Sequence, residues 1–409
     1  MRILYIGPLP PEAGGRILCG ASAHGWELAR RAARRGHEAA YLAPTSVRKT
    51  FTREGVRVID QPFRKWRKAW DGWRFGRGLG RREREAVRPF GGRERLAVLG
   101  RALFIRRTID AVRPDGVHLQ AIEHGGPLSF ALQGRPVPAV ATDHGYWRFV
   151  QSPEDLARMK SGLGGLKRLI VVSTYARERA VRDGFENLVP VTIIHNPVDP
   201  DEAGPAEREA VRKEWGWNKK RGLFFSGVTS SLAVKGLDIL LEALRCRPVL
   251  KATCRLVALA DAEGESYARR FAAENGLDVL VRTEVPHRRA RALCGAADVC
   301  VGPSRADALP LVFGESLAAG VPVVGFGPAV RELAGLLGMS VGEPFDADKE
   351  TPADLGEKVE AVLGWTTERG ILREAFGRRL SWEAQFPAFD ELYRTAFRPR
   401  DAGSPEGRP

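Results

Sequence analysis

The sequence predicts an α/β protein made of two doubly wound domains, each built on a parallel sheet, and three observations support this prediction. The chain has 409 residues, which is too long for one hydrophobic core and suits two domains of roughly 200 residues each. Short apolar runs alternate with helical patterns along the whole chain, as in parallel sheets covered by helices on both faces. Residues 195–205 hold three prolines and a glycine, which is typical of a stiff connector between domains.

The predicted strands are runs of three to five mostly apolar residues bounded by turn-forming or polar positions. In the first half they span residues 3–6, 39–42, 116–119, 138–142 and 169–172, and in the second half residues 223–226, 255–259, 279–281, 299–301 and 321–324. A helix is expected over residues 19–35, since Gly36 follows it as a stop signal. Ligands of such sheets bind beyond the carboxyl ends of the strands.

The net charge of +14 implies attraction to an anionic partner such as nucleic acid, an acidic membrane surface or a phosphorylated ligand. Much of the excess lies in one segment, where Arg64, Trp66, Trp70 and Trp73 mark residues 64–73 as a group of tryptophans among cations. This segment either lies against an anionic membrane surface or packs its indole rings on the parent domain. Because the basic cluster is confined, we expect no nucleic acid partner.

The chain shows no signal peptide and no window approaching the roughly 18 apolar residues of a membrane span. We therefore expect a cytoplasmic protein, with peripheral attachment to the inner membrane face if residues 64–73 bind lipid. The five cysteines show neither zinc-ligand nor disulfide spacing. We expect no metal and no cofactor.

Two carboxylates surround a predicted helix start in the second half. Pro310 and Gly320 bracket a short helix, Asp307 precedes it, and Glu315 lies about a turn and a half inside it. The free N–H groups at such a helix start favour an anion such as phosphate, and a carboxylate at each end can accept pairs of hydroxyl hydrogen bonds. A nucleotide sugar has both groups. The alternative is that Asp307 only caps the helix and Glu315 is a solvated surface charge.

Two further loops can approach a ligand. Gly14 and Gly15 follow the first predicted strand and allow close backbone approach, although a structural turn explains them equally well. No Gly-x-Gly-x-x-Gly motif is present there, so a nicotinamide or flavin site is not supported. In the second half, the loop after residues 223–226 delivers Lys235 to a helix start, where a lysine can neutralise a diphosphate.

Taken in order, these motifs resemble glycosyltransferase family 4, whose members are retaining enzymes of the GT-B architecture, with two Rossmann-like domains facing a central cleft. The resemblance spans residues 1 to about 398 and rests on four pieces: Gly14-Gly15 with Leu28-Ala29 and Gly36-His37-Glu38; Val172-Ser173-Thr174 with Asn196-Pro197-Val198-Asp199; Lys235-Gly236-Leu237-Asp238; and Asp307 to Glu315 with Gly320-Val321-Pro322. It implies an acceptor-side domain over residues 1–195 and a nucleotide-sugar domain over residues 196–380. A terminal helix over residues 381–398 would cross back to the first domain, and residues 399–409 would be a disordered tail.

The resemblance also implies roles for the donor-binding residues. Asp307 would contact the hydroxyls of the donor sugar and Glu315 those of the ribose, with the amides of Ala308, Leu309 and Leu311 near the diphosphate. Lys235 would stabilise the leaving diphosphate. Gly14 and Gly15 would allow the donor to approach the backbone closely. The base is expected beside residues 283–287.

Two departures from the family pattern stand out. The family usually has glutamate where this chain has Asp307, and it commonly has arginine where this chain has Val228. Either Lys235 acts alone on the diphosphate or another arginine, such as Arg305, substitutes. In the first domain, His144 matches a family histidine that borders the donor sugar and the acceptor.

The sequence thus predicts a retaining glycosyltransferase that moves a sugar from a nucleoside diphosphate sugar to a hydroxyl acceptor. Cell-envelope polysaccharide or glycolipid synthesis and natural-product synthesis, such as that of aminoglycosides, are the pathways considered. A nucleotide-sugar 2-epimerase of the same fold is the main alternative, and a basic nucleic-acid-binding protein is a remote one.

Overall fold

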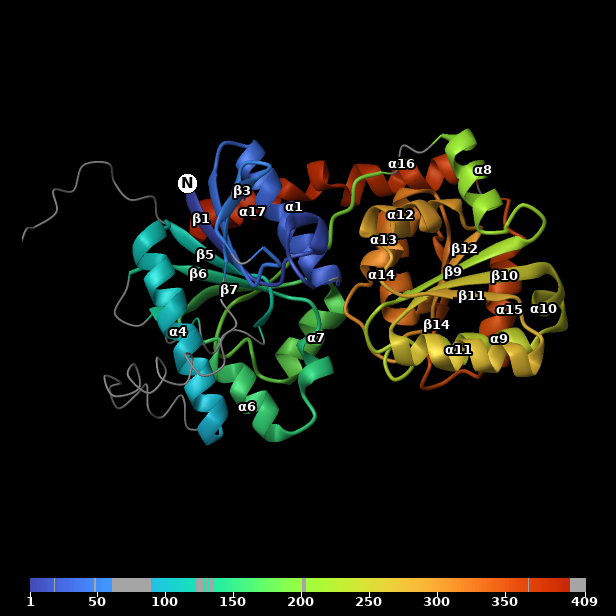
Figure 1. The fold of residues 1–409 in the computed structure, drawn as a ribbon, viewed down its shortest axis with the longest axis horizontal. Coiled ribbons are helices and arrows are strands. Elements are labelled where there is room, and N and C mark those ends of the chain that lie inside the picture. Colours follow the sequence, from blue (N-terminus) through green and yellow to red (C-terminus); the bar gives the residue numbers. More distant parts are fainter. Residues whose placement is uncertain are drawn as a thin grey trace, which may run out of the picture.

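The structure, a computed structural model, describes residues 1–17, 19–47, 49–60, 90–122, 128, 131–132, 136–200, 204–366 and 368–397. These residues form two α/β domains placed side by side, with the first and last parts of the chain in the same domain (Figure 1). The tryptophan-rich residues 64–73 and the tail of residues 399–409 lie outside the described residues, so the predictions made for them are not tested by the structure.

The first domain is built on an eight-stranded sheet within the described part of the chain, with the order β3-β4-β2-β1-β5-β6-β7-β8. Only the edge strand β3 is antiparallel to its neighbour. The strands are β1 Arg2–Ile6, β2 Glu38–Ala43, β3 Phe51–Arg53, β4 Val56–Asp60, β5 Gly116–Leu119, β6 Ala139–Asp143, β7 Leu166–Val171 and β8 Val191–Ile193. The described helices are η1 Pro11–Ala13, α1 Gly20–Arg34, α4 Gly92–Val112, η3 Tyr146–Phe149, α6 Pro153–Ser161 and α7 Thr174–Arg182.

The second domain has a parallel six-stranded sheet in the order β11-β10-β9-β12-β13-β14, as described over residues 204–366. Its strands are β9 Arg221–Gly227, β10 Cys254–Ala260, β11 Val279–Arg282, β12 Val299–Gly302, β13 Val323–Phe326 and β14 Gly342–Phe345. Its helices are α8 Pro205–Glu214, α9 Leu237–Cys246, α10 Pro248–Thr253, α11 Ala262–Asn275, α12 His287–Ala296, α13 Leu311–Ala318, α14 Gly327–Leu337, α15 Pro352–Leu363 and α16 Arg369–Leu380. Strand order reverses between β9 and β12, which is the point where ligands of such sheets bind.

The last helix, α17 (Trp382–Ala396), leaves the second domain and packs against the first, beside β1 (Figure 1). Its buried aromatic side chains join the core formed by β1, β2 and α1. His118 Nδ1 lies 2.7 Å from Tyr393 Oη, and His37 Nε2 lies 3.0 Å from Asp390 Oδ1. The chain therefore crosses between the domains twice, once through residues 195–200, called the linker below, and once just before α17.

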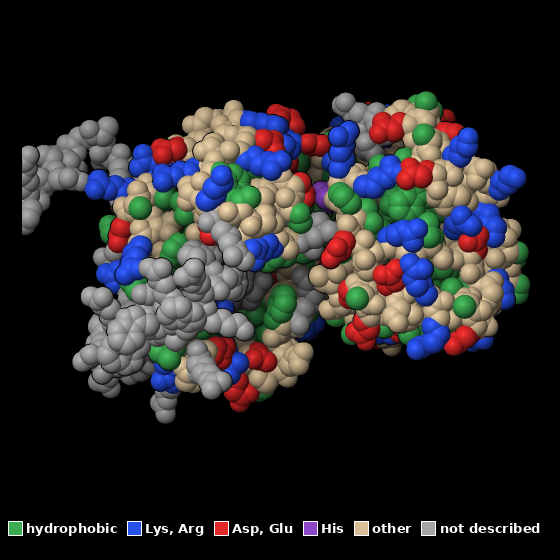
Figure 2. All heavy atoms as spheres, viewed as in Figure 1, with side chains coloured by type: hydrophobic (Ala, Val, Ile, Leu, Met, Phe, Trp, Pro, Cys, Tyr) green, Lys and Arg blue, Asp and Glu red, His purple; other side chains and the backbone are tan. Residues whose placement is uncertain are grey.

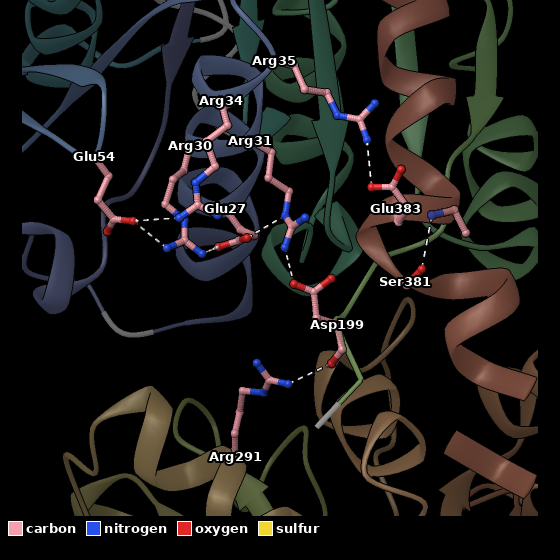
Figure 3. Close-up of polar contacts among 11 residues, drawn as sticks. Glu27, Arg30, Arg31, Arg34, Arg35, Glu54, Asp199, Arg291, Ser381 and Glu383 are labelled. Atoms are coloured by element: carbon pink, nitrogen blue, oxygen red, sulfur yellow. Dashed lines mark hydrogen bonds and ion pairs between the residues drawn. The ribbon is translucent and has the colours of Figure 1, made fainter. Parts of the chain in front are cut away.

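The linker contacts both domains. Asp199 forms an ion pair with Arg31 of α1 and accepts a hydrogen bond at its backbone carbonyl from Arg291 of α12, at 2.9 Å (Figure 3). On the same side of the molecule, Arg35, directly after α1, donates to Glu383 of α17 at 3.0 Å (Figure 3). Charged contacts thus connect the linker, α1, α12 and α17.

The predicted α/β architecture of two parallel sheets is confirmed, and each of the ten predicted strands forms. Strands β3, β4, β8 and β14 were not predicted. Three of them are edge strands of three or four residues, too short to give a clear pattern, and β14 also contains Pro344. Strand β4 does alternate, as Val56-Arg57-Val58, and this signal was missed. Strand β13 begins two residues later than predicted because the N–H of Val321 bonds the carbonyl of Ser316 and so closes α13.

Candidate functional site

A cavity of about 710 Å³ lies between the domains. The first domain contributes Glu12 and His24 to its wall, the second contributes His287, Leu311 and Glu315, and the linker and α17 close one side. The helix starts of α1 and α13 meet here, since a Cβ placed on Gly20 would lie only 3.7 Å from Leu311 Cβ. Figure 2 shows a furrow between the two domains.

Asp307 follows β12 and forms an ion pair with Lys235, which follows β9. Both side chains are largely buried, with 6% and 16% exposed. Asp307 Oδ1 also accepts a hydrogen bond from the N–H of Ala308 at 2.9 Å. Asp307 is therefore not the cap of α13, whose N-cap is Pro310, and the capping interpretation is wrong.

Gly236 explains how Lys235 reaches Asp307. This glycine has a left-handed backbone with φ of +76°, and a Cβ at this position would lie 2.2 Å from the carbonyl oxygen of Pro303. The loop after β9 can therefore approach the loop after β12 only because position 236 carries no side chain. In the Lys235-Gly236 sequence, the glycine thus allows the two loops to pack closely, and the lysine supplies the positive charge.

Glu315 lies in the second turn of α13 and is 8% exposed, so the interpretation of a solvated surface charge is also wrong. Its Oε1 lies 2.5 Å from Nε2 of His287, the first residue of α12. Burial lowers the pKa of His287, but the hydrogen bond to Glu315 and its negative charge raise it by more, so the pKa lies above its ordinary value of 6.5. Both side chains line the cavity.

The first domain and the linker hold the backbone between the two carboxylates. Ser173 Oγ donates to the carbonyl of Ala308 at 3.0 Å, and Asn196 Nδ2 donates to the carbonyl of Leu309 at 3.1 Å. Both donors and both acceptors are buried. The placement of the loop before α13 consequently depends on contacts from outside its own domain.

Gly14 and Gly15 have explanations within the first domain. Gly14 adopts a left-handed φ of +89° and its carbonyl accepts from the N–H and hydroxyl of Ser46, each at 3.0 Å. A Cβ on Gly15 would lie 1.8 Å from the carbonyl oxygen of Leu9. These contacts account for both glycines without a ligand, and it is Glu12 of the same loop that lines the cavity.

His144 follows β6 at a turn that Asp143 stabilises, since Asp143 Oδ1 accepts from the N–H groups of Gly145 and Tyr146 at 3.0 and 2.8 Å. The ring of His144 meets that of His24 edge to face, with 5.0 Å between centroids. His24 is buried, and burial lowers its pKa to about 4, although the hydrogen bond that its Nδ1 donates to Gln120 Oε1 and the negative charge of Glu27 act in the opposite direction. His144 therefore does not line the cavity itself. It contacts His24, which does line the cavity and is neutral at pH 7.

Arg305 does not take the place of the arginine that Val228 replaces. Its guanidinium donates to both carboxylate oxygens of Asp238, at 3.0 and 2.6 Å, and to the carbonyl of Leu232 at 2.8 Å. Val228 packs against the apolar core. Lys235 is therefore the cation that the described residues bring to Asp307.

The structure groups the predicted residues in two places. Leu311 and Glu315 line the cavity, and Lys235 and Asp307 meet beside the start of α13; Gly14, Gly15 and His144 lie outside the cavity wall. The sequence interpretation did not pair His287 with Glu315 and did not consider His24. The position of His287 directly after Pro286, at a helix start, was the available signal. Among the described residues no cluster of acidic, histidine or cysteine side chains fits a metal ion.

The arrangement combines a buried lysine, two buried carboxylates and a helix start within one interdomain region. Each carboxylate oxygen has two lone pairs, so a carboxylate that already accepts one hydrogen bond per oxygen can also accept from a hydroxyl, and a lysine at a helix start can balance the charge of a phosphate. This chemistry suits a ligand that carries both hydroxyl and phosphate groups.

Two family models match the sequence of this chain. The model of "Glycosyltransferase Family 4" matches residues 19–202, and that of "Glycosyl transferases group 1" matches residues 220–363. No curated protein matches the sequence. Similar solved structures include the sucrose-phosphate synthase of Thermosynechococcus elongatus, with 17% identity, a TM-score of 0.72 and coverage of 97% of this chain and 99% of that one.

Two further structures extend the likeness. HepE of Anabaena, solved in complex with UDP-glucose, is 16% identical with a TM-score of 0.70 and covers 97% of this chain and 100% of its own. WaaG, a glycosyltransferase involved in lipopolysaccharide biosynthesis, is 15% identical with a TM-score of 0.60 and covers 98% of this chain and 100% of its own. At these identities the likeness concerns the fold.

Proposed function

The chain belongs to the family 4, group 1 glycosyltransferases and has their GT-B architecture, and from this premise we propose that it transfers a sugar from a nucleoside diphosphate sugar to a hydroxyl group with retention of configuration. The observation that carries the proposal is the pair of buried carboxylates, Asp307 and Glu315, on either side of the start of α13. Burying two carboxylates is costly unless each has a partner, and here Asp307 pairs with Lys235 and Glu315 with His287, whose pKa is raised.

The donor would lie along the loop before α13. Glu315 would accept hydrogen bonds from the ribose hydroxyls, and Asp307 would accept them from the sugar. The amides of Leu309 and Leu311 and the ammonium of Lys235 would face the diphosphate; that of Ala308 already donates to Asp307. The structure of HepE with UDP-glucose, on the same fold, supports a nucleotide-sugar donor.

In the reaction, the bond between the anomeric carbon and the diphosphate oxygen breaks while the acceptor oxygen bonds to the same face of that carbon. The departing phosphate takes the proton of the acceptor hydroxyl. Negative charge grows on the diphosphate during this step, and Lys235 and the helix start would stabilise it. His144 would orient the acceptor hydroxyl or the sugar from the opposite domain.

The proposal is tested by incubating the protein with UDP and GDP sugars and following donor consumption by chromatography. A thermal-shift screen of the same compounds selects the donor first, since a ligand at a hundred times its dissociation constant adds about 2.7 kcal/mol to the free energy of unfolding. Failure of every nucleotide sugar to bind would contradict the proposal. Conversion of the donor to an isomer without acceptor would identify a 2-epimerase instead.

For the acceptor, we propose a hydroxyl of a cell-envelope glycan, a glycolipid or a natural product. None of the described helices is long and apolar enough to cross a membrane. Peripheral membrane attachment remains a proposal that liposome flotation with anionic lipid tests, and flotation at low salt would favour a lipid-linked acceptor. On the face seen in Figure 2, Lys and Arg side chains are interspersed with Asp and Glu over the second domain, unlike a nucleic-acid interface.

A further inference from the structure

His287 and Glu315 form a pair in the cavity wall that the proposed donor chemistry does not by itself explain. Glu315 belongs to α13 and His287 to α12, so the contact joins two neighbouring helices at their cavity ends. Within the described part of the chain, His287 is the only hydrogen-bond partner of the Glu315 side chain, at 2.5 Å. A buried carboxylate with a single partner depends strongly on that partner for its position and charge.

We propose that His287 is a positioning residue that holds Glu315 in place to bind the ribose hydroxyls of the donor. The inference rests on the proposed function and adds to it a residue that determines nucleoside affinity. His287 binds Oε1 of Glu315, which leaves Oε2 to accept a hydrogen bond from a ligand in the cavity. Without His287, the carboxylate would turn away or take up a proton, and a protonated carboxyl accepts hydrogen bonds more weakly.

Charges from three elements act on His287. Glu315 of α13 and Glu12 of η1, in the other domain, favour its protonated form, whereas Arg291, one turn along α12, opposes it. Because the pKa of His287 is raised, the imidazolium persists to a higher pH than in a free histidine, and it loses its charge as the pH rises through that pKa. Donor affinity should therefore fall as the pH rises through the pKa of His287, because the hydrogen bond then loses its charge assistance.

The decisive comparison uses His287→Phe and His287→Gln with UDP and GDP as probes in titration calorimetry. His287→Phe removes the donor to Glu315 and should weaken binding of the preferred nucleotide about tenfold or more, the effect of losing one charge-assisted hydrogen bond. His287→Gln keeps an uncharged N–H donor that does not titrate, so it should bind better than His287→Phe, match the affinity that the wild type keeps once His287 is neutral, and show no dependence on the titration of this residue. In turnover assays the effect should appear in KM for the donor, with kcat changed little.

The 2′,3′-dideoxy forms of the same nucleotides give the specific control, since they lack the hydroxyls that Glu315 would bind. Their affinity should be the same for the wild type and for His287→Phe. Arg289→Gln, on the same helix but paired with Glu214 on the outside, should change neither probe's affinity.

The outcomes separate the two proposals. If neither nucleotide binds the wild type, the proposed function fails and this inference with it. If Glu315→Gln weakens nucleotide binding but His287→Phe does not, or if His287→Phe weakens the dideoxy forms equally, the proposed function stands and the positioning role of His287 is refuted.

Discussion

Lys235 acts on two partners, the buried Asp307 in the structure and, in our proposal, the diphosphate of the donor. Lys235→Ala should lower kcat by roughly a hundredfold or more, because removing one donor that stabilises developing charge costs about 2.7 to 4 kcal/mol of barrier. The change also leaves Asp307 without its cation, which should lower the free energy of unfolding by about 1–3 kcal/mol.

Both effects are measured on one preparation, by initial rates at saturating donor and by urea unfolding. Lys251→Ala, at an exposed position of α10, is the matched control and should change neither. Turnover like that of the wild type in Lys235→Ala would refute the role of this lysine in the reaction.

The buried histidines predict how stability depends on pH. His118 lies between Tyr393 and Thr142, at 2.7 and 2.8 Å, and burial lowers its pKa to about 3, with a smaller effect from His24. Below pH 6.5 the unfolded chain takes up a proton at this histidine that the folded chain does not, so the free energy of unfolding falls as the pH decreases. Between pH 6.5 and 4 this one residue should account for a loss of roughly 2–3 kcal/mol, since each pKa unit corresponds to about 1.36 kcal/mol.

The measurement is urea unfolding followed by tryptophan fluorescence at a series of pH values. His118→Gln should be less stable at pH 7.5 but should lose less stability on going to pH 4. Lys251→Ala, the exposed control on α10 described above, should keep the wild-type slope. An unchanged slope in His118→Gln would contradict the prediction.

At the scale of elements, the loops after β9 and β12 form one unit because glycine allows them to touch. Gly236→Ala would place a methyl group 2.2 Å from the carbonyl oxygen of Pro303 at a left-handed φ. We expect a loss of about 1–3 kcal/mol in stability from the backbone strain, together with loss of activity as Lys235 moves away from Asp307. Thermal unfolding and initial rates check the two parts.

Gly335→Ala, within α14, is the comparison for this change, because nothing lies within 4 Å of a Cβ added there. It should stabilise the protein slightly, since alanine is the better helix former. If Gly236→Ala behaved in the same way, the close approach of the two loops would not be essential.

At the scale of the whole molecule, Glu332 connects the domains. From α14 it accepts hydrogen bonds from the N–H and hydroxyl of Thr174, at 2.7 and 3.0 Å, and it lies 3.0 Å from Nε2 of His195. Burial raises the pKa of Glu332, but the bonds from His195 and Thr174 lower it by more, so the carboxylate stays ionised in mildly acidic solution. The contact stabilises the arrangement in which α7 and α14 lie together.

Glu332→Ala should loosen this contact and increase the radius of gyration in small-angle scattering, because the domains then open more freely about the linker. The KM for the donor should rise, since Ser173 and Asn196 would no longer hold the loop before α13 continuously. Glu357→Ala, at an exposed position of α15, should leave the scattering unchanged. If Glu332→Ala had the same radius of gyration as the wild type, the other interdomain contacts would be sufficient to hold the two domains together.

The sequence predicted more of the fold than of the site. The central strands were predictable because parallel strands buried on both faces are continuous apolar runs, whereas the edge strands β3 and β14 are too short or too polar for that signal. The motifs singled out Asp307, Glu315 and Lys235 as candidates, but they did not predict the burial of both carboxylates or the partner of each.

By itself, the sequence determined the alternation of strands and helices, the division into two domains and the order of the motifs, because these depend on residues close together in the chain. The tertiary structure alone decided that Lys235 meets Asp307 across 72 positions and that His287 meets Glu315 across 28. The reason is physical: these contacts depend on which strands neighbour one another and on how closely two loops or helices pack. No local pattern of residues encodes those distances.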